Sequence, residues 1–328
     1  MRGGPDSLVL ADVDDPVAGA GQLLVRVSAV GVNYTDGLLI RDQYQVKPPR
    51  PFSPGAEFSG FVEATGSDVT HVKAGDLVMG RCGWGALAER IAIDQSRCVR
   101  IPTETSPAAA AGFLFPYATS YYALRDLAEL RPGETMLVLG AAGGVGSAAV
   151  DLGRALGARV VVAVSSMEKL DFALSRGATN GLVYPNMLDE PAAQQDLAQA
   201  LKQIVGPEGA HVVFDPVGGP YSEPALRTLC PGGRHMVVGF AAGIPRIPLN
   251  LVLLKRCKVI GVDWRAFVLS DPIGNDRNVA TLLAMWREGS IHPGSPKKFP
   301  FESAPEAIGK VERREALGKI VITLGSQN

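Results

Sequence analysis

A glycine-rich stretch, LVLGAAGGVGSAAV, occupies residues 137–150. It stands between an apolar run at 135–140, which predicts a β-strand, and a helix predicted from Ser147 onward. Glycine adopts positive φ and lets a backbone approach a pyrophosphate, while the N–H groups at a helix start attract an anion. We therefore predict a dinucleotide-binding turn. Its contacts are expected from Gly140, Ala142, Gly143, Gly144, Val145 and Gly146. The alternative is a tightly packed strand–helix crossing. The spacing is one residue longer than the strict fingerprint, since Ala141 and Ala142 occupy the place of one residue.

The next predicted strand, residues 159–165, decides which dinucleotide we expect. It ends on Ser165, which Ser166 follows, at the place where an NAD site carries Asp or Glu. A carboxylate would repel a 2′-phosphate, whereas hydroxyls can donate to it and Lys169, one turn later, can neutralise it. We therefore predict NADPH as the cofactor. The alternative makes Lys169 a solvated helix lysine, and Glu168 beside it is expected to face water.

The 328 residues fall into two regions with different sequence patterns. Short apolar runs broken by Gly and Pro predict a mainly antiparallel β domain; they cover residues 7–13, 21–32, 55–66, 75–80 and 87–93. From about Pro107, helical and strand patterns alternate. The predicted strands cover residues 135–140, 159–165, 181–184, 211–217, 234–240 and 258–264. Such nearly continuous apolar runs are typical of a doubly wound parallel sheet.

The last apolar run, residues 317–324, has no neighbour in this alternation, so we expect it to return to the first domain. The predicted fold class is therefore α/β with two domains. A Rossmann dinucleotide-binding domain is expected at 113–265. A discontinuous, mainly β domain is expected at 1–112 and 266–328.

The charge balance limits the partners of the chain. The 32 basic and 33 acidic residues leave a net charge of -1, without the basic surface that nucleic acid or anionic membrane requires. No run approaches the roughly 18 apolar residues of a bilayer span, and residues 1–15 lack the apolar core of a secretory signal. The four cysteines show no CxxC spacing that would indicate disulfides or structural zinc. We expect a cytoplasmic protein with a small-molecule partner.

Motifs spread over nearly the whole chain carry a family resemblance. They are VSAVGVNYTD (27–36), YQVKPPRPFSPGAEFSGFVEATG (44–66), VKAGDLV (72–78), LGAAGGVGSAAV (139–150), FDPVGG (214–219) and LGKIVI (317–322). The chain resembles the zinc-free quinone oxidoreductases, relatives of zeta-crystallin within the medium-chain dehydrogenase/reductase superfamily. The resemblance implies that the first domain is a GroES-like catalytic domain, although the first strand usual in the family is missing from residues 1–10.

The resemblance also bears on metal binding. Zinc-dependent relatives carry a cysteine where this chain has NYTD, residues 33–36, and a His-Glu pair where it has Ala56 and Glu57. Catalytic zinc needs three protein ligands, so we expect no metal. The protein would then mainly hold the acceptor, exclude water and stabilise a developing oxyanion while NADPH supplies the hydride.

In the catalytic domain the resemblance implies three site residues. It places Asn33 near the nicotinamide and substrate, where its amide is expected to bond a carbonyl. Tyr34 and Tyr44 are expected to line the acceptor pocket. A turn role for Asn33 and simple packing for the two tyrosines are the alternatives.

For the cofactor, the resemblance places Thr119 near the pyrophosphate or nicotinamide ribose, and Tyr184 near the adenosine phosphate. Arg314 is expected to reach the 2′-phosphate, with the adjacent Arg313 as the alternative register. Asp215 and Phe240 are further candidates, because they follow later strands at the edge where a doubly wound sheet binds its ligand.

The activity that the resemblance implies is hydride transfer from NADPH to a quinone or a related enone. An enoyl-thioester or acrylyl-type reductase is the alternative, since both acceptors take hydride at a position conjugated to oxygen. A non-catalytic NADPH-binding protein is the third reading. Relatives usually pair through the cofactor domain, so we expect a homodimer with edge-strand pairing at residues 261–269, unless Trp264 is simply core.

Overall fold

A computed structural model describes residues 3–188 and 190–325. Its contacts divide the chain into two compact units. Unit 1 comprises Met1–Phe115 and Gly294–Asn328, and unit 2 comprises Pro116–Pro293. Unit 1 is therefore discontinuous in sequence.

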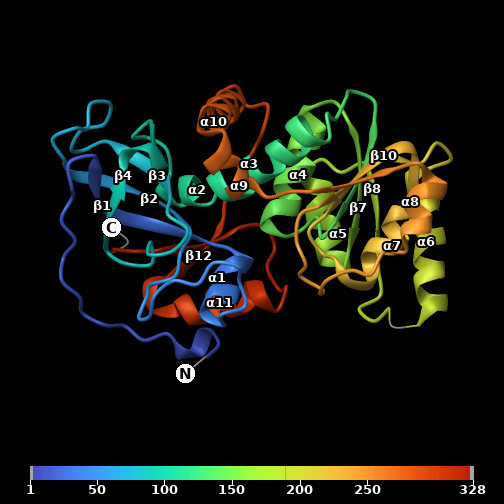
Figure 1. Cartoon of the computed structure of the whole chain (residues 1–328), viewed down its shortest axis with the longest axis horizontal. Coiled ribbons are helices and arrows are strands. Elements are labelled where there is room, and N and C mark those ends of the chain that lie inside the picture. Colours follow the sequence, from blue (N-terminus) through green and yellow to red (C-terminus); the bar gives the residue numbers. More distant parts are fainter. Residues whose placement is uncertain (1–2, 189, 326–328) are drawn as a thin grey trace. The chain divides into compact units, whose positions relative to one another are not determined.

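Unit 1 is built around a seven-stranded sheet that is antiparallel except at its β12 edge (Figure 1). The strands are β1 (Gln22–Val32), β2 (Glu57–Thr65), β3 (Leu77–Arg81), β4 (Arg90–Asp94), β5 (Cys98–Ile101), β12 (Lys297–Pro300) and β13 (Ile320–Thr323). β1 is central: it pairs with β2 on one side, and with β4 and then β13 on the other. Because β13 pairs antiparallel with β1, the predicted return of the C-terminal run is confirmed.

Short helices complete unit 1. They are η1 (Pro5–Ser7), α1 (Tyr34–Ile40), η2 (Gln95–Arg97), α2 (Pro107–Ala111), η5 (Phe301–Ser303) and α11 (Ala304–Glu312). The strand predicted at residues 7–13 is wrong, because no β-structure forms over residues 8–19. Val9 and Val13 are 84% and 80% exposed there, so this apolar run has no sheet against which to pack.

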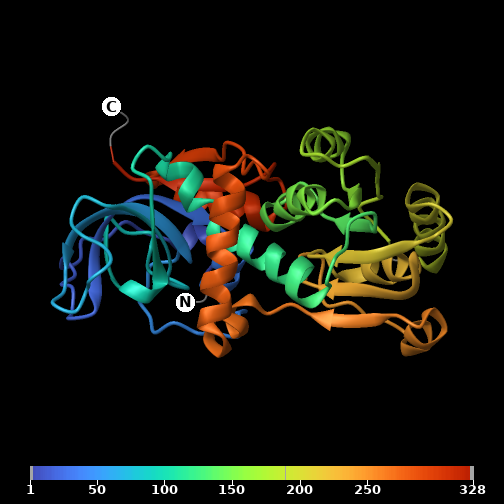
Figure 2. The same ribbon diagram turned by 90° about the horizontal axis from the view of Figure 1, so that it is seen from above.

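Unit 2 contains a six-stranded sheet in which every neighbouring pair is parallel. The strands are β6 (Thr135–Leu139), β7 (Arg159–Val164), β8 (Asn180–Val183), β9 (Ala210–Asp215), β10 (Leu229–Val237) and β11 (Lys258–Gly261). Their order is β11-β10-β9-β6-β7-β8, with β11 at one edge (Figure 2). This is the doubly wound order of a Rossmann fold, so the predicted α/β class is confirmed.

Helices cover both faces of this sheet. The helices of unit 2 are α3 (Leu114–Tyr121), which begins in unit 1, the π-helix η3 (Tyr122–Leu127), α4 (Gly144–Ala155), α5 (Met167–Ser175), α6 (Pro191–Val205), η4 (Gly219–Tyr221), α7 (Ser222–Leu226), α8 (Leu249–Lys255), α9 (Trp264–Ser270) and α10 (Pro272–Arg287). Figure 1 shows α4 and α5 on one side of the strands, and α6, α7 and α8 on the other. Strand residues such as Leu137, Val161 and Val213 are therefore fully buried, which explains why their sequence shows no polar alternation.

The contacts place the boundary of unit 2 later than residue 265, where the sequence put it. The rings of Tyr122 and Phe267 stack with centroids 4.2 Å apart. The backbone N–H of His292 donates to Asp151 Oδ2 at 2.7 Å. Residues 266–293, which include the long helix α10 (orange in Figure 2), thus pack with unit 2.

The segment 261–269 differs from the strand that was expected there. β11 ends at Gly261 and α9 starts at Trp264, so most of the segment is helical. Trp264 is 7% exposed and its Nε1 donates to Asn275 Oδ1 at 3.0 Å. The alternative reading of Trp264 as core is therefore correct, and only Gly261 of this segment belongs to the edge strand β11.

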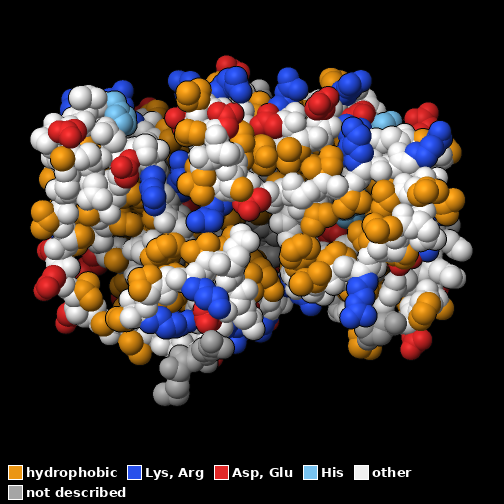
Figure 3. Space-filling view, viewed as in Figure 1, with side chains coloured by type: hydrophobic (Ala, Val, Ile, Leu, Met, Phe, Trp, Pro, Cys, Tyr) orange, Lys and Arg blue, Asp and Glu red, His pale blue; other side chains and the backbone are white. Residues whose placement is uncertain are grey.

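The surface mixes both signs of charge. On the face shown in Figure 3, basic and acidic side chains are interspersed among apolar ones. Throughout residues 3–188 and 190–325, no helix is both long and apolar enough to cross a membrane. The same residues contain no group of three His, Cys, Asp or Glu side chains that could hold a metal ion.

Candidate functional site

The glycine turn connects β6 to α4 at the carboxyl edge of the parallel sheet. Gly140 has φ +60°, a conformation that side chains other than glycine rarely adopt. The N–H of Gly143 donates to the Gly140 carbonyl at 3.0 Å and closes the turn. A Cβ on Gly146 would lie 2.3 Å from the Gly140 oxygen, so only glycine lets α4 approach the turn this closely. The structure thus brings together the turn residues that the sequence predicts.

The start of α4 presents N–H groups without a side-chain cap. Gly143 is the N-cap, and it has no side-chain oxygen to satisfy the first amides of the helix. The unpaired N–H groups and the positive end of the helix dipole favour an anion at this position. Ala142 lies in the turn and is 2% exposed, so it offers only backbone. Val145 accepts a hydrogen bond on its carbonyl from Ser120 Oγ at 3.0 Å, which ties α3 to the first turn of α4.

Two hydroxyls follow β7, and a lysine lies in the first turn of the next helix, α5. Lys169 Nζ donates to Ser165 Oγ at 2.8 Å, and Ser166 Oγ caps α5 by accepting from the Lys169 N–H at 3.3 Å. Glu168, by contrast, is exposed, as expected. Because β6 and β7 are adjacent and parallel, this cationic group lies at the same sheet edge as the glycine turn.

Thr119 supplies an independent sign of a ligand. Its side chain is 8% exposed, and among the described residues nothing hydrogen-bonds its buried Oγ1. Buried polar atoms are normally paired, so an orphaned hydroxyl indicates a missing partner. A dinucleotide fits the site on two observations: the Thr119 hydroxyl has no partner among the described residues, and the start of α4 has no side-chain cap.

Tyr184 is placed differently from the expectation. It is 8% exposed, and its ring packs against Tyr221 with centroids 4.5 Å apart. Tyr184 therefore belongs to the core on one face of the sheet. The predicted contact of Tyr184 with an adenosine phosphate stays a prediction.

Asp215 organises a loop from within. Its Oδ1 accepts from the N–H groups of Val217 and Gly218 at 2.9 and 2.8 Å, while Ser222 Oγ and His235 Nε2 bond its Oδ2. These bonds hold the pKa of the carboxyl below its usual range, even though burial raises it. Because both oxygens already have partners, the geometry makes Asp215 a residue that shapes the 216–219 turn rather than a direct cofactor ligand.

Phe240 lies beside that turn. The turn pairs with the loop after β10, since the N–H of Gly219 donates to the Gly243 carbonyl at 2.7 Å. The ring of Phe240 is 46% exposed in this loop and remains free to contact a ligand at the carboxyl edge.

Unit 1 contains a buried ionic cluster that the sequence did not predict. Lys319 Nζ lies 2.6 Å from Glu57 Oε1, and it also donates to Asn33 Oδ1 at 2.7 Å and to the Val32 carbonyl at 2.9 Å. Glu57 is 1% exposed and also accepts from the Phe115 N–H at 2.8 Å. A buried carboxylate needs a nearby cation, and Lys319 provides it.

The cluster changes the role of Asn33. Its Nδ2 donates to Glu57 Oε1 at 3.0 Å and to the Gly31 carbonyl at 3.2 Å. The ammonium of Lys319 can only donate, so the orientation of the amide is fixed. Both N–H hydrogens are thus engaged, and the expected bond to a substrate carbonyl is not supported by this geometry; the turn role fits instead.

Asp36 completes the cluster. Its carboxyl accepts from the backbone N–H groups of Asn33 at 2.7 Å and Gly55 at 3.1 Å. Burial raises the pKa of Asp36 from 3.8 to about 6, and the nearby Glu57 adds to this effect against the opposing hydrogen bonds and Lys319. Within the unit 1 cluster, Asp36 therefore holds its proton more tightly than an exposed carboxyl does.

The remaining predicted residues also lie in unit 1. Tyr34 opens α1 and is half-buried, and Tyr44 is half-buried in the loop between α1 and β2. Arg314 is exposed just after α11, with φ +60°. Arg313, its alternative, pairs with Glu315 at 2.8 Å. The contacts expected from Tyr34, Tyr44 and Arg314 stay predictions.

Lys319 and Glu57 are the residues that sequence reasoning missed. A signal was present, because a lone Glu in the apolar run AEFSGFV must either face solvent or meet a buried cation. LGKIVI then places a lysine directly before a buried strand. What the sequence could not supply is the pairing of β13 with β1, which brings Lys319 to the end of that strand.

Comparison with known proteins agrees with this architecture. Residues 19–103 match the model of an alcohol dehydrogenase GroES-like domain, and residues 144–275 match that of a zinc-binding dehydrogenase. Quinone oxidoreductase-like protein 2 of Rattus norvegicus is 37% identical over 319 residues, which cover 97% of this chain and 89% of that protein.

Solved structures are similar over nearly the full length. Escherichia coli quinone oxidoreductase complexed with NADPH matches with a TM-score of 0.89 and 27% identity, covering 99% of this chain and 98% of that one. The CurK enoyl reductase matches with a TM-score of 0.84 and 25% identity, covering 98% and 96%. The chain therefore belongs to the zinc-free, quinone oxidoreductase-like family of medium-chain dehydrogenases/reductases.

Proposed function

We propose that this protein is an NADPH-dependent reductase that delivers hydride to a conjugated carbonyl acceptor, a quinone or a related enone. The observation that carries the proposal is the pairing of Lys169 with Ser165 at the carboxyl end of β7, where an NAD site has Asp or Glu, together with the uncapped helix start that follows the glycine turn. This combination favours a dinucleotide that carries an additional phosphate. The similarity to an NADPH-complexed quinone oxidoreductase supports it.

The residues divide the work of binding. The N–H groups at the start of α4 bind the diphosphate, and Lys169 with Ser165 binds the 2′-phosphate. The hydroxyl of Thr119 donates to the bound cofactor and so gains the partner that it lacks within the protein. When bound, NADPH supplies the hydride. In unit 1, the Lys319–Glu57 pair holds Asn33 and the start of α1, which positions Tyr34 as an acceptor contact.

Steady-state oxidation of NADPH tests this function. We expect turnover with a naphthoquinone and little turnover with crotonyl-coenzyme A. The variant Tyr34→Phe removes only the hydroxyl, so a lower kcat with unchanged NADPH affinity would support its role at the acceptor. Turnover of the thioester alone would instead favour the enoyl reductase alternative, for which the similarity to the CurK enoyl reductase is the supporting observation. Absence of turnover with both acceptors would favour a non-catalytic NADPH-binding protein.

We further propose that the protein acts as a cytoplasmic homodimer. None of the four described cysteines forms a disulfide, which fits a reducing compartment. β11 ends the parallel sheet with an unpaired edge, and Val259 on it is 43% exposed. An open edge strand is a template for pairing with a second copy.

A further inference from the structure

One recess in unit 2 lies away from the glycine turn. It has a volume of about 400 Å³ and is lined by four apolar and three basic residues: Leu229, Pro231, Leu251, Leu254, Lys202, Arg227 and Lys255. Leu229 and Pro231 belong to the amino end of β10, whereas the glycine turn follows the carboxyl end of β6. The recess therefore lies at the amino ends of the parallel strands, and the nucleotide site lies at their carboxyl ends.

The cations of this recess lack full compensation. Among the described residues, no carboxylate pairs with Lys202 or Lys255, and only Arg227 has one, Glu223, at 2.6 Å. Lys255 Nζ donates to the Leu229 carbonyl at 3.1 Å, which leaves two of its three ammonium hydrogens for another acceptor. Burial and repulsion from Lys202 both lower the pKa of Lys255, as expected where like charges face one another.

Helix dipoles offset the positive charges of this recess only in part. Lys202 is in the last turn of α6, and Lys255 is in the last turn of α8. Each helix end contributes about half a negative charge, which one lysine more than offsets. A net positive charge therefore remains in the recess, and an anion would remove the repulsion.

The apolar residues define the rest of the ligand. Leu229 and Leu251 are buried and form the inner surface, while Leu254 is 69% exposed. Inorganic ions cannot use such contacts, whereas an alkyl chain gains free energy by covering them. We propose that this recess binds a small organic anion, with a carboxylate held by Lys202 and Lys255 and an apolar chain packed on the leucines. The proposal is independent of the reductase function.

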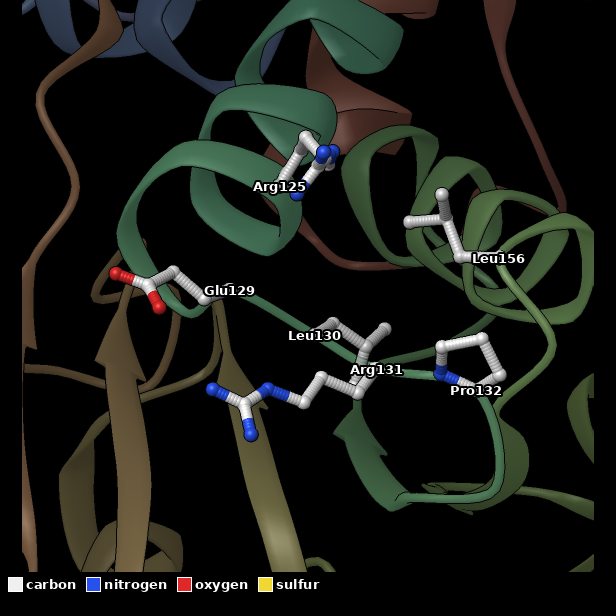
Figure 4. A pocket seen from close by; sticks show the side chains of 6 residues that line it. All are labelled: Arg125, Glu129, Leu130, Arg131, Pro132 and Leu156. Atoms are coloured by element: carbon white, nitrogen blue, oxygen red, sulfur yellow. The ribbon is translucent and has the colours of Figure 1, made fainter.

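A different recess of unit 2 serves as a control. It has a volume of about 450 Å³ and is lined by Arg125, Glu129, Leu130, Arg131, Pro132 and Leu156 (Figure 4). Here a carboxylate, that of Glu129, accompanies the two arginines. Arg131 is exposed, so Arg131→Gln removes one positive charge at little structural risk.

Calorimetric titration with octanoate tests the proposal, with neutral octanol and inorganic phosphate as comparison probes. We expect one saturable octanoate site per chain, and tighter binding of octanoate than of either comparison probe. Lys202→Gln and Lys255→Gln should each weaken octanoate binding roughly tenfold, because each removes a charged hydrogen-bond donor. Arg131→Gln should leave it unchanged, and thermal melting of every variant verifies folding.

Three results would overturn the proposal. The first is the absence of saturable octanoate binding, and the second is equal or tighter binding of octanol or phosphate. The third is an affinity that both lysine variants retain. Octanoate should also bind equally well with and without NADPH, because the two sites are at opposite edges of the sheet. Displacement of octanoate by NADPH would assign octanoate to the nucleotide site and refute the recess.

Discussion

Lys319 shows how one buried cation can organise a site. It is the only described lysine whose ammonium contacts Glu57, Asn33 and the end of β1 together. Removing one member of a buried ion pair leaves the other charge uncompensated, whereas removing both often costs little. Comparing a single variant with a double variant can therefore show whether the two charges stabilise each other.

The variant Lys319→Met should lower the free energy of unfolding by about 3–5 kcal/mol, because the carboxylate of Glu57 then stays buried without a cation. Adding Glu57→Gln should restore most of that loss, since the double variant buries no net charge. Urea unfolding of the two variants and the parent measures both effects. A change below about 0.5 kcal/mol for Lys319→Met would contradict the buried ion pair.

Asp36 predicts a pH dependence with a definite sign. Its pKa rises from 3.8 to about 6 on folding, so the folded state binds more protons within this window. The free energy of unfolding should therefore fall as pH rises through the window, by about 3 kcal/mol from this group. This contribution is present below the unfolded pKa and is lost above the folded one.

The variant Asp36→Asn should lack this slope, although it is expected to be less stable overall because it loses one backbone acceptor. The measurement is the difference in unfolding free energy between parent and variant from acidic to neutral pH. A difference that does not change with pH would show that Asp36 does not titrate in this range.

Among the secondary-structure elements, the turn between β6 and α4 contains glycines with two different roles, packing within the protein and contact with a ligand. Gly146 is required by the protein itself, because its Cβ would meet backbone atoms of residues 140 and 141. Gly143 is not: its φ of -80° suits any residue, and its Cβ would meet nothing closer than 3.6 Å. A glycine that the fold does not need is explained if a ligand approaches it closely.

The variant Gly143→Ala should therefore keep its thermal stability to within about 1 kcal/mol, the cost of alanine at an N-cap. Its NADPH affinity should fall by at least tenfold, because the added methyl group meets the diphosphate. Gly146→Ala is the matched comparison and should lose stability as well as affinity. Unchanged NADPH binding by Gly143→Ala would place the diphosphate elsewhere.

Elements differed in how far the sequence could predict them. The parallel strands of unit 2 were predictable because burial on both faces leaves uninterrupted apolar runs. Residues 7–13 have the same apolar character yet form no strand, since local pattern does not reveal whether a partner strand exists. The helix α9 was missed for a related reason: its apolar residues follow β11 directly and extend the apolar pattern of that strand.

The candidate site divided along the same line. The residues of the glycine turn could be predicted from the sequence, because the conformation of a turn depends on neighbouring residues. Asn33 and Asp215 could not be resolved from sequence, because their partners, Lys319 and His235, are distant along the chain. Sequence identifies these side chains but not which of their hydrogen bonds are already made.

At the scale of the whole molecule, the unpaired edge of β11 makes the oligomeric state testable. Size-exclusion chromatography with light scattering should give the mass of a dimer for the parent. Val259→Lys adds a charge at the edge and should shift the equilibrium toward monomer without changing the melting behaviour of unit 2. A monomeric parent, or a variant that remains fully dimeric, would contradict pairing through β11.

We propose that the chain as a whole holds a phosphorylated dinucleotide by the uncapped start of α4 and by Lys169. The direct measurement is calorimetric titration of the purified protein with NADPH and with NADH, repeated for Lys169→Ala and for the control Lys202→Ala. We predict that NADPH binds more tightly than NADH, that Lys169→Ala removes most of this preference, and that Lys202→Ala leaves it intact. Equal affinity for the two cofactors, or equal losses for both in Lys169→Ala, would contradict the account.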